Sequence, residues 1–262
     1  MRIDVYLTEN GYTRSRQRAR VLIEEGKVRV DGVTVKKPSY SIEGEHTVTV
    51  LDDLPYVGRG GLKLAGALDA FRLEVTNMKA LDVGASTGGF TDCLLQRGAK
   101  QVVAVDAGEG QLDAKLLADA RVTNLEHTNA RELTLPMIGG EAVDLIVMDV
   151  SFISATYILP RFPALMGESG HAICLIKPQF EVGKALLGKG GIVKDAAAHR
   201  YAIERVLDAG RGVGLTPIGL IPSPIEGGDG NREFLVHFVK RADTDRNTHP
   251  VDTAAITRVI KG

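Results

Sequence analysis

The apolar and polar positions of residues 58–240 follow two alternating periods. Apolar stretches of strand length are separated by stretches in which apolar residues recur at helical spacing, an order typical of a parallel sheet with helices on both faces. The predicted strands cover residues 80–83, 101–105, 144–150, 171–176, 215–221 and 233–239, with one short strand before residue 125. The predicted helices cover residues 90–96 and 196–209, and another holds Leu64, Leu68 and Phe71. We therefore predict an α/β domain here.

The first fifty residues follow a different pattern. Ser15 is a suitable N-cap for a helix that ends at Glu25. Two short strand-like stretches then flank Asp31-Gly32, a dipeptide that favours a tight hairpin turn. We therefore predict a small α+β domain at residues 1–50.

The remaining segments are predicted from composition. A linker is expected at 51–57, where Pro55 interrupts the chain, and the larger domain then spans 58–240. A polar tail follows at 241–262, with a marginal helix at 252–260 to which we assign no function.

Basic residues concentrate in the small domain. Eight basic and three acidic residues between positions 14 and 37 give this segment a net charge of +5. Because the whole chain has a formal net charge of −1, binding to nucleic acid would have to come from such a patch. A solvated helix face is the alternative, but a helix, an Arg-rich helix and a hairpin in this order resemble the S-four (αL) RNA-binding domain. The candidate RNA-binding residues are Arg14, Arg16, Arg18, Arg20, Lys27, Arg29, Lys36 and Lys37.

The composition excludes several classes of protein. Hydrophobic residues make up 44% and charged residues 25% of the chain, as in ordinary soluble proteins. No apolar run approaches the roughly 20 residues of a membrane helix, and MRIDVYLTEN is neither a signal nor a transit peptide. Cys93 and Cys174 lie in apolar segments without clustered histidines, which argues against zinc. We expect a cytoplasmic protein with no metal and no membrane partner.

A small-residue turn joins the first predicted strand of the larger domain to a helix. The G-x-G-x-x-G dinucleotide pattern would need a glycine at Ser86, so that interpretation fits poorly. Asp82-x-Gly84-x-Ser86-x-Gly88 instead resembles the first motif of class I S-adenosylmethionine-dependent methyltransferases, in which the acid and the turn hold the methionine end. The candidate cofactor residues of this stretch are Asp82, Gly84, Ser86, Thr87, Gly88, Gly89 and Phe90.

Polar residues also end the following strands, where a parallel sheet binds its ligands. Asp106 lies where such folds hold a ribose hydroxyl pair, and Asn129-Ala130 lies where the methyltransferase family contacts adenine. Asp149 and Lys177 close two further apolar strands, and Asp149 completes the candidate cofactor residues. A charged residue in this position is often only the solvated end of its strand.

Several longer motifs resemble the TlyA (hemolysin A) family, in which an S-four domain is fused to an FtsJ-like ribose methyltransferase. These motifs are G-R-G-G-x-K-L, L-D-V-G-A-S-T-G-G-F-T, M-D-V-S-F-I-S, I-K-P-Q-F-E and R-E-F. The resemblance implies a Rossmann-like, mostly parallel seven-stranded sheet, S-adenosyl-L-methionine as cofactor, and ribosomal RNA or a ribosomal subunit as partner. It also implies a Lys–Asp–Lys–Glu tetrad formed by Lys63, Asp149, Lys177 and Glu233.

The tetrad residues suit methylation of a ribose 2′-hydroxyl, which is a poor acid. Lys177 could act as the base or as a cation that stabilises the developing alkoxide, while Asp149 and Glu233 orient the lysines. Lys63 lies off the apolar stripe of its helix and is expected to be exposed. It would favour the uncharged form of Lys177 by repulsion between like charges.

Three hypotheses therefore follow from the sequence. Methylation of ribose in ribosomal RNA is favoured, an RNA-binding protein with a silent methyltransferase scaffold is second, and a membrane-lytic hemolysin is third. The glycine-rich stretch between Glu181 and Asp195, with Lys184, Lys189 and Lys194, is predicted to be a mobile lid or a substrate loop. The modified nucleotide, the ribosomal subunit and the oligomeric state are left open.

Overall fold

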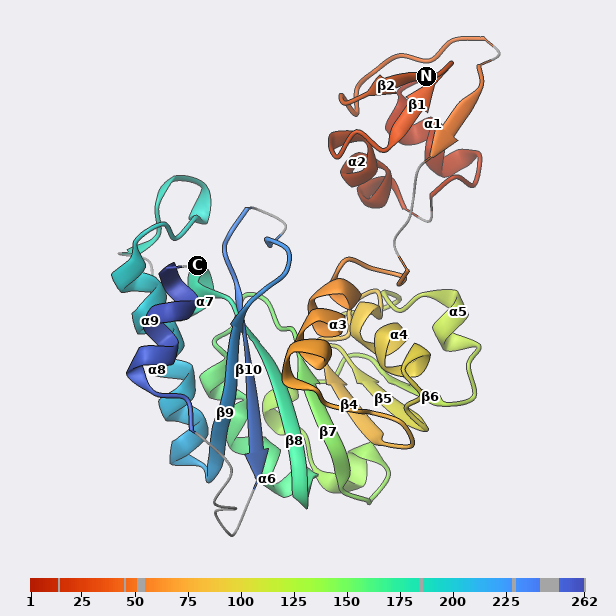
Figure 1. The fold of residues 1–262 in the computed structure, drawn as a ribbon. Coiled ribbons are helices and arrows are strands. Elements are labelled where there is room, and N and C mark those ends of the chain that lie inside the picture. Colours follow the sequence, from red (N-terminus) through yellow and green to blue (C-terminus); the bar gives the residue numbers. More distant parts are fainter. Residues whose placement is uncertain are drawn as a thin grey trace. The chain divides into compact units, whose positions relative to one another are not determined.

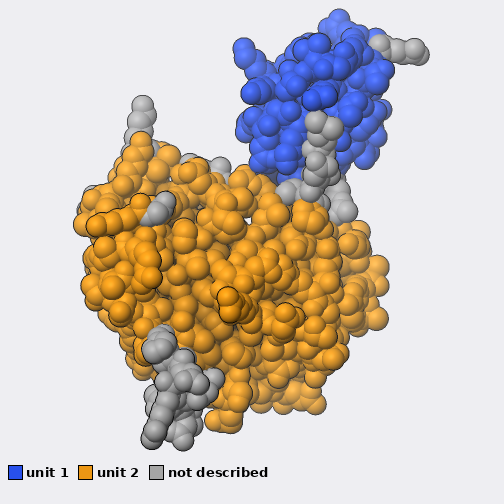
Figure 2. Space-filling view, in the orientation of Figure 1, with its two compact units in different colours: residues 1–54 blue, residues 55–262 orange. Residues whose placement is uncertain are grey.

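A computed structural model describes residues 1–13, 15–44, 46–50, 55–183, 186–227, 230–240 and 250–261. The chain divides into two compact units, Met1–Leu54 and Pro55–Gly262 (Figure 2). Each unit is described by itself. Arg14, Lys184, residues 51–54 of the predicted linker and residues 241–249 and 262 of the predicted tail lie outside the described residues, as does the side chain of Lys189.

Unit 1 is a small α+β fold. Its elements are α1 (Ile3–Glu9), α2 (Arg16–Glu24), β1 (Val28–Val30), β2 (Val33–Val35) and β3 (Val48–Val50). The strands form an antiparallel sheet in the order β2-β1-β3, and apolar residues of the sheet and both helices form one core. The Ser15 hydroxyl accepts a hydrogen bond from the backbone N–H of Arg18 at 3.1 Å, which confirms the predicted N-cap. Asp31 and Gly32 both have positive φ, as the predicted hairpin turn requires.

Unit 2 is built on a seven-stranded sheet in the order β6-β5-β4-β7-β8-β10-β9 (Figure 1). The first five strands run parallel, and β10 lies antiparallel between β8 and β9. The predicted Rossmann-like sheet is therefore confirmed. The strands are β4 (Lys79–Val83), β5 (Gln101–Val105), β6 (Val122–Leu125), β7 (Val143–Met148), β8 (Met166–Ile176), β9 (Leu215–Pro222) and β10 (Phe234–Lys240).

Helices cover both faces of this sheet (Figure 1). One face packs against α3 (Gly60–Phe71), α4 (Gly89–Gln96) and α5 (Ala114–Leu117). The other packs against α6 (Phe162–Leu165), α8 (Ala196–Gly212) and α9 (Thr253–Lys261). Alternate residues of the central strands enter the two cores, because successive side chains of a strand point to opposite faces.

Several details go beyond the sequence prediction. The predicted loop after residue 181 is preceded by a short helix, α7 (Pro178–Glu181), and contains a 3₁₀ turn, η6 (Lys189–Gly191). Within the predicted linker, Pro55 and Val57 are fixed to α4: the Gln96 side chain donates to Pro55 O at 2.7 Å, and Val57 N donates to Asp92 Oδ2 at 2.9 Å. In the part of the chain that the structure describes, no helix is both long and apolar enough to cross a membrane.

Candidate active site

The turn between β4 and α4 depends on its glycines. Gly84 has a φ of 84°, and a Cβ there would lie 2.5 Å from the backbone oxygen of Asp149. Gly88 has a φ of 93°, and its Cβ would lie 2.1 Å from Leu116 Cδ1. Glycine is therefore required both by conformation and by space. The turn thus lies close to Asp149, the residue that follows β7.

Asp106 ties the end of β5 to this turn. Its carboxylate accepts hydrogen bonds from Ser86 N and from Gly108 N, both at 2.8 Å. Gln111 Nε2 donates to it as well, at 3.3 Å. The side chain is half-buried at the carboxyl edge of the sheet, and a carboxylate has lone pairs beyond the three used here. Asp106 can therefore accept further hydrogen bonds from the hydroxyl groups of a ligand.

Asp82 is the most deeply buried acid at this edge. One oxygen accepts a hydrogen bond from the Thr91 hydroxyl at 2.7 Å, while Oδ1 has no partner among the described residues. The pKa of Asp82 is raised to about 7: burial is the main cause, the negative charges of Asp149 and Asp106 add to it, and the hydrogen bond from Thr91 opposes it. The crevice thus gathers three acids, and its potential favours a cation.

The other predicted cofactor residues differ in their exposure to solvent. Asn129 and Ala130 begin a 3₁₀ turn, η1 (Ala130–Glu132), just after a segment in which Thr128 N donates to Asp106 O at 2.9 Å. Thr87 is exposed and Gly89 is buried. The side chain of Phe90 is also buried, in the core between α3 and α4.

These features suit S-adenosylmethionine. Its sulfonium and ammonium groups are cations, which match the three acids, and among the described residues the buried acceptor Asp82 Oδ1 has no partner. Its ribose hydroxyls match a carboxylate such as that of Asp106. The positions Gly84 and Gly88 let the backbone approach a ligand closely.

The structure brings the four predicted tetrad residues together as two lysine–acid pairs. Lys177 Nζ lies 2.6 Å from Asp149 Oδ1, and Lys63 Nζ donates to Glu233 Oε2. The register explains the arrangement: Phe234 of the antiparallel β10 is paired with Ile176 of β8, so Glu233 lies at the same edge as Lys177.

Lys63 corrects one expectation. It is only 7% exposed, because its ammonium is paired with the buried acid Glu233. Burial raises the pKa of Glu233, against the opposing effect of Lys63 and, more weakly, of Lys177. The two pairs are therefore close enough to influence one another electrostatically.

The segment after β7 carries features that the sequence prediction missed. Lys177 Nζ donates to the Ser151 hydroxyl at 2.8 Å. The next residue, Phe152, has a φ of 65° and is 92% exposed, with its ring centroid 5.3 Å from that of Phe180 in α7. Only the M-D-V-S-F-I-S motif itself could have signalled that residues beyond Asp149 matter.

Asn231 is a second residue that the prediction missed. It is buried, its Oδ1 accepts from Val193 N at 3.0 Å, and its Nδ2 donates to Gly191 O at 3.2 Å. The end of the glycine-rich stretch is therefore anchored two residues before Glu233. Lys194, which follows, is exposed. The role of the stretch as a lid or substrate loop stays a prediction.

The basic residues of unit 1 have different surroundings. Arg16 and Arg2 both bind the buried carboxylate of Asp4, at 3.0 and 2.9 Å. The hydrogen bond from Arg2, followed by that from Arg16, lowers the pKa of Asp4 to about 2. Arg16 thus has a structural role in joining α2 to α1. The exposed residues Arg20, Arg29, Lys36 and Lys37 are available to a phosphate backbone, while Arg18 and Lys27 are half-buried.

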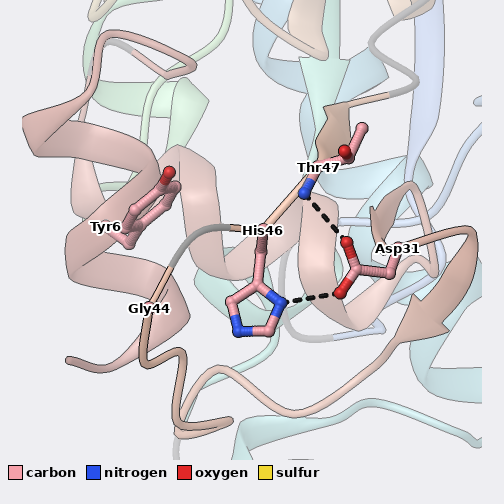
Figure 3. A pocket seen from close by; sticks show the side chains of 5 residues that line it. All are labelled: Tyr6, Asp31, Gly44, His46 and Thr47. Carbon is pink, nitrogen blue, oxygen red and sulfur yellow. Dashed lines mark hydrogen bonds and ion pairs between the residues drawn. The ribbon is translucent and has the colours of Figure 1, made fainter.

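Unit 1 also has a polar surface pocket (Figure 3). Tyr6, Asp31, Gly44, His46 and Thr47 line it. His46 Nδ1 lies 2.6 Å from Asp31 Oδ2, and Thr47 N donates to Asp31 Oδ1 at 2.9 Å. Asp31 thus binds both His46 and Thr47. These contacts attach the segment before β3 to the hairpin turn.

Comparisons with known proteins identify both domains of the chain. Residues 56–240 match the model for the FtsJ-like methyltransferase family, and residues 1–48 match the S4 domain. The 16S/23S rRNA (cytidine-2′-O)-methyltransferase TlyA of Mycobacterium tuberculosis is 44% identical over 247 residues, which cover 94% of this chain and 91% of the relative. The chain belongs to the TlyA family of FtsJ-like methyltransferases.

Other similar proteins carry a different name. Hemolysin A of Brachyspira hyodysenteriae is 41% identical, over 91% of this chain and 100% of the relative. A solved structure from Streptococcus thermophilus, described as a hemolysin, superposes with a TM-score of 0.79 at 37% identity, covering 100% of this chain and 94% of that one. The two names thus occur among TlyA-family proteins that share nearly the whole chain.

Proposed function

We propose that this chain transfers a methyl group from S-adenosylmethionine to the 2′-hydroxyl of a cytidine in ribosomal RNA. The observation that carries the proposal is the Lys177–Asp149 pair, which stands at the ends of neighbouring strands with Lys63–Glu233 beside it. The nucleoside and the class of RNA come from the name of the Mycobacterium tuberculosis relative. The exposed basic residues of unit 1 provide sequence-independent affinity for RNA.

The cofactor would be held by the first half of the site. Asp106 would accept hydrogen bonds from its ribose hydroxyls, Asn129 and Ala130 would border its adenine, and Asp82 with the Gly84–Gly88 turn would face its methionine end. When bound, S-adenosylmethionine supplies a methyl carbon that is already activated by its sulfonium. The remaining task is to prepare the attacking oxygen.

The lysine–acid tetrad would perform that task. Asp149 and Ser151 fix the position of Lys177 Nζ from two sides, at 2.6 and 2.8 Å. Lys177 would take the proton of the 2′-hydroxyl, or would stabilise the negative charge that develops on its oxygen. The Glu233–Lys63 pair balances one charge with another, so the site holds two positive and two negative side chains around the reacting group.

Substitution of Lys177 tests the proposal. Wild-type protein with labelled S-adenosylmethionine and isolated ribosomal subunits should place label on a ribose 2′-oxygen, located by mass mapping. Lys177→Met should lower the rate by at least about 100-fold with donor binding unchanged, because general acid–base groups contribute roughly this much. Lys177→Arg distinguishes the two roles, because a guanidinium keeps its proton but still supplies a positive charge.

Lys100→Met is the matched control. Lys100 is exposed and directly precedes β5, so it lies at the amino ends of the parallel strands, opposite to Lys177. Wild-type turnover by Lys177→Met would remove Lys177 from the mechanism. Donor binding without transfer to any subunit, by the wild-type protein, would favour the silent-scaffold alternative. Since relatives are named hemolysins, the same preparations are added to liposomes. Leakage that persists in Lys177→Met would reveal a separate lytic activity.

A further inference from the structure

A buried carboxylate with no part in the proposed chemistry lies four residues after Lys177. Glu181, at the end of α7, is 2% exposed. Its Oε2 accepts a hydrogen bond from the Ser154 hydroxyl at 2.5 Å, and its Oε1 accepts one from Ala155 N at 2.8 Å. Both carboxylate oxygens are thus used to hold the segment that follows Asp149.

Such burial is costly, so it needs a compensating gain. Removing a carboxylate from water disfavours its charged form. Burial accordingly raises the pKa of Glu181, while the hydrogen bonds from Ser154 and Ala155 act in the opposite direction. The backbone oxygen of Glu181 in turn accepts a hydrogen bond from Arg205 Nη1 of α8 at 2.5 Å. Glu181 is therefore fixed to a long helix on one side and to a loop on the other.

The loop is tied at its start by a hydrogen bond from Asp149 N to Val83 O and by packing of Val150 and Ile153 against the core. Between Asp149 and Ser154 it carries the exposed Ser151 and Phe152, and Phe152 adopts a left-handed conformation. A non-glycine residue in that region is strained and persists only where the surroundings enforce it. The side chain of Phe152 contributes little, because it is almost fully exposed.

Two sets of contacts join this loop to the segment after β8. At one end, Lys177 binds Asp149 and Ser151. At the other end, Glu181 binds Ser154 and Ala155. We infer that Glu181 is a positioning residue: it fixes the 149–155 loop so that Asp149 and Ser151 hold the Lys177 ammonium in place. This inference rests on the proposed function, in which Lys177 meets the attacking oxygen.

Two substitutions of Glu181 should behave differently. Glu181→Ala removes both acceptors, so Ala155 N–H loses its partner and the Ser154 hydroxyl keeps only its contacts with Thr156. Glu181→Gln keeps one carbonyl oxygen for Ala155 N. Its amide can donate to the Ser154 hydroxyl, which would then donate to Thr156 Oγ1, 2.7 Å away. The glutamine variant should therefore preserve the loop.

The experiment compares single-turnover methyl transfer at saturating donor and RNA, at a temperature where each variant is folded. Glu181→Ala should lose at least about tenfold in rate, because small displacements of catalytic groups are costly. Its donor affinity should stay within about twofold of wild type, because Asp82 and Asp106 are held by Thr91, Ser86 and Gly108 and not by Glu181. Glu181→Gln should recover most of the rate. Ser154→Ala removes only one of the two contacts of Glu181, so its rate should lie between those of Glu181→Ala and Glu181→Gln.

Asp144→Ala is the stability control. Asp144 accepts a hydrogen bond from Lys79 N at 2.8 Å, at the opposite end of β7 from Asp149. If it loses stability and rate in the same proportion as Glu181→Ala, the effect is general destabilisation and the inference fails. A folded Glu181→Ala with wild-type rate would also overturn it.

A measurement that needs no RNA separates this inference from the proposed function. The chain contains no tryptophan, so Phe152→Trp provides a single fluorescent reporter in the loop. Glu181→Ala in that background should lower the steady-state anisotropy of the reporter, and Glu181→Gln should not. Unchanged anisotropy in the alanine variant would show that Glu181 does not hold the loop. Wild-type protein that transfers no methyl to RNA, with the anisotropy difference present, would overturn the proposed function and leave the structural tie established.

Discussion

Asp82 carries an acid–base property that can be measured directly. Its carboxylate is completely buried beside Asp149 and Asp106, and its pKa is raised to about 7. The unfolded chain has the usual aspartate pKa of about 4. Its contribution to stability is therefore fully present below about pH 4 and is lost as the pH rises through about 7. A cationic ligand reverses this balance, because it favours the charged carboxylate.

Donor binding should consequently depend on pH. Affinity for S-adenosylmethionine should rise roughly tenfold from about pH 6 to about pH 8, and binding at the lower pH should release a proton. Calorimetry in two buffers of different ionisation enthalpy would measure that proton. In Asp82→Asn, the affinity should no longer change with pH because of the protein. Only the titration of the ligand itself should remain. Equal wild-type affinities at the two pH values, without proton release, would contradict the assignment.

At the scale of single residues, the sequence located positions better than it located environments. The motif predicted Lys63, but helical periodicity placed it on the solvent side, because its partner Glu233 is 170 residues away. Periodicity within one helix cannot reveal a partner of that kind. Glu181 was visible in the I-K-P-Q-F-E motif, yet its role depends on Ser154 and Ala155, which only the tertiary fold brings near.

At the scale of elements, Arg232 attaches the C-terminal helix α9 to the start of β10. The Arg232 guanidinium donates to Val259 O and to Ile260 O, both at 2.7 Å, and lies over the Phe234 ring at 5.5 Å. A guanidinium at the end of a helix satisfies carbonyls that have no partner in the helix. The helix predicted as marginal from sequence is therefore stabilised by tertiary contacts.

Arg232→Met should loosen this helix. The loss of two hydrogen bonds from a charged donor should cost about 2 kcal/mol and should speed amide exchange in α9 selectively. Arg258→Met is the matched control, because Arg258 is exposed on the same helix. Hydrogen exchange followed by mass spectrometry and urea unfolding would measure both effects. Equal α9 protection in the two variants would exclude this role for Arg232.

The element prediction succeeded where local pattern decides and failed where topology does. The strand at 101–105 was predicted with its observed bounds, because its apolar run is bounded by polar residues. The first five residues of β8 were missed, because Met166–Gly170 contains Glu168, Ser169 and two glycines and has no strand-like pattern. Nothing local indicated that β10 would enter between β8 and β9.

At the scale of the whole molecule, the two units have separate cores. The apolar cluster of unit 1 lies wholly within residues 3–50, and those of unit 2 begin at Tyr56. Each unit therefore has a hydrophobic core of its own, as a part of a chain that folds independently requires. The cut belongs before Pro55, since Pro55 and Val57 are bonded to α4.

Residues 55–262 alone should bind the donor with wild-type affinity but should fail to methylate ribosomal subunits. RNA binding by the full chain should weaken steeply with salt, with a slope of about −0.7 to −0.9 per phosphate contact. In the full chain, Lys36→Ala with Lys37→Ala should reduce that slope, whereas Lys100→Ala should not. Filter binding over a salt series would measure the slopes. Efficient methylation by residues 55–262 would show that unit 1 is dispensable.

The position of β10 has a consequence for the order in which the protein is made. β9 has one hydrogen-bonded neighbour in the sheet, β10, which is synthesised after it. Until residues 234–240 leave the ribosome, β9 has no strand to pair with, and the edge of β8 is open. Glu233 enters the site in the same step. On the proposed function, a nascent chain would carry the cofactor residues before it carries the complete tetrad, and would transfer no methyl group until residues 233–240 had been made.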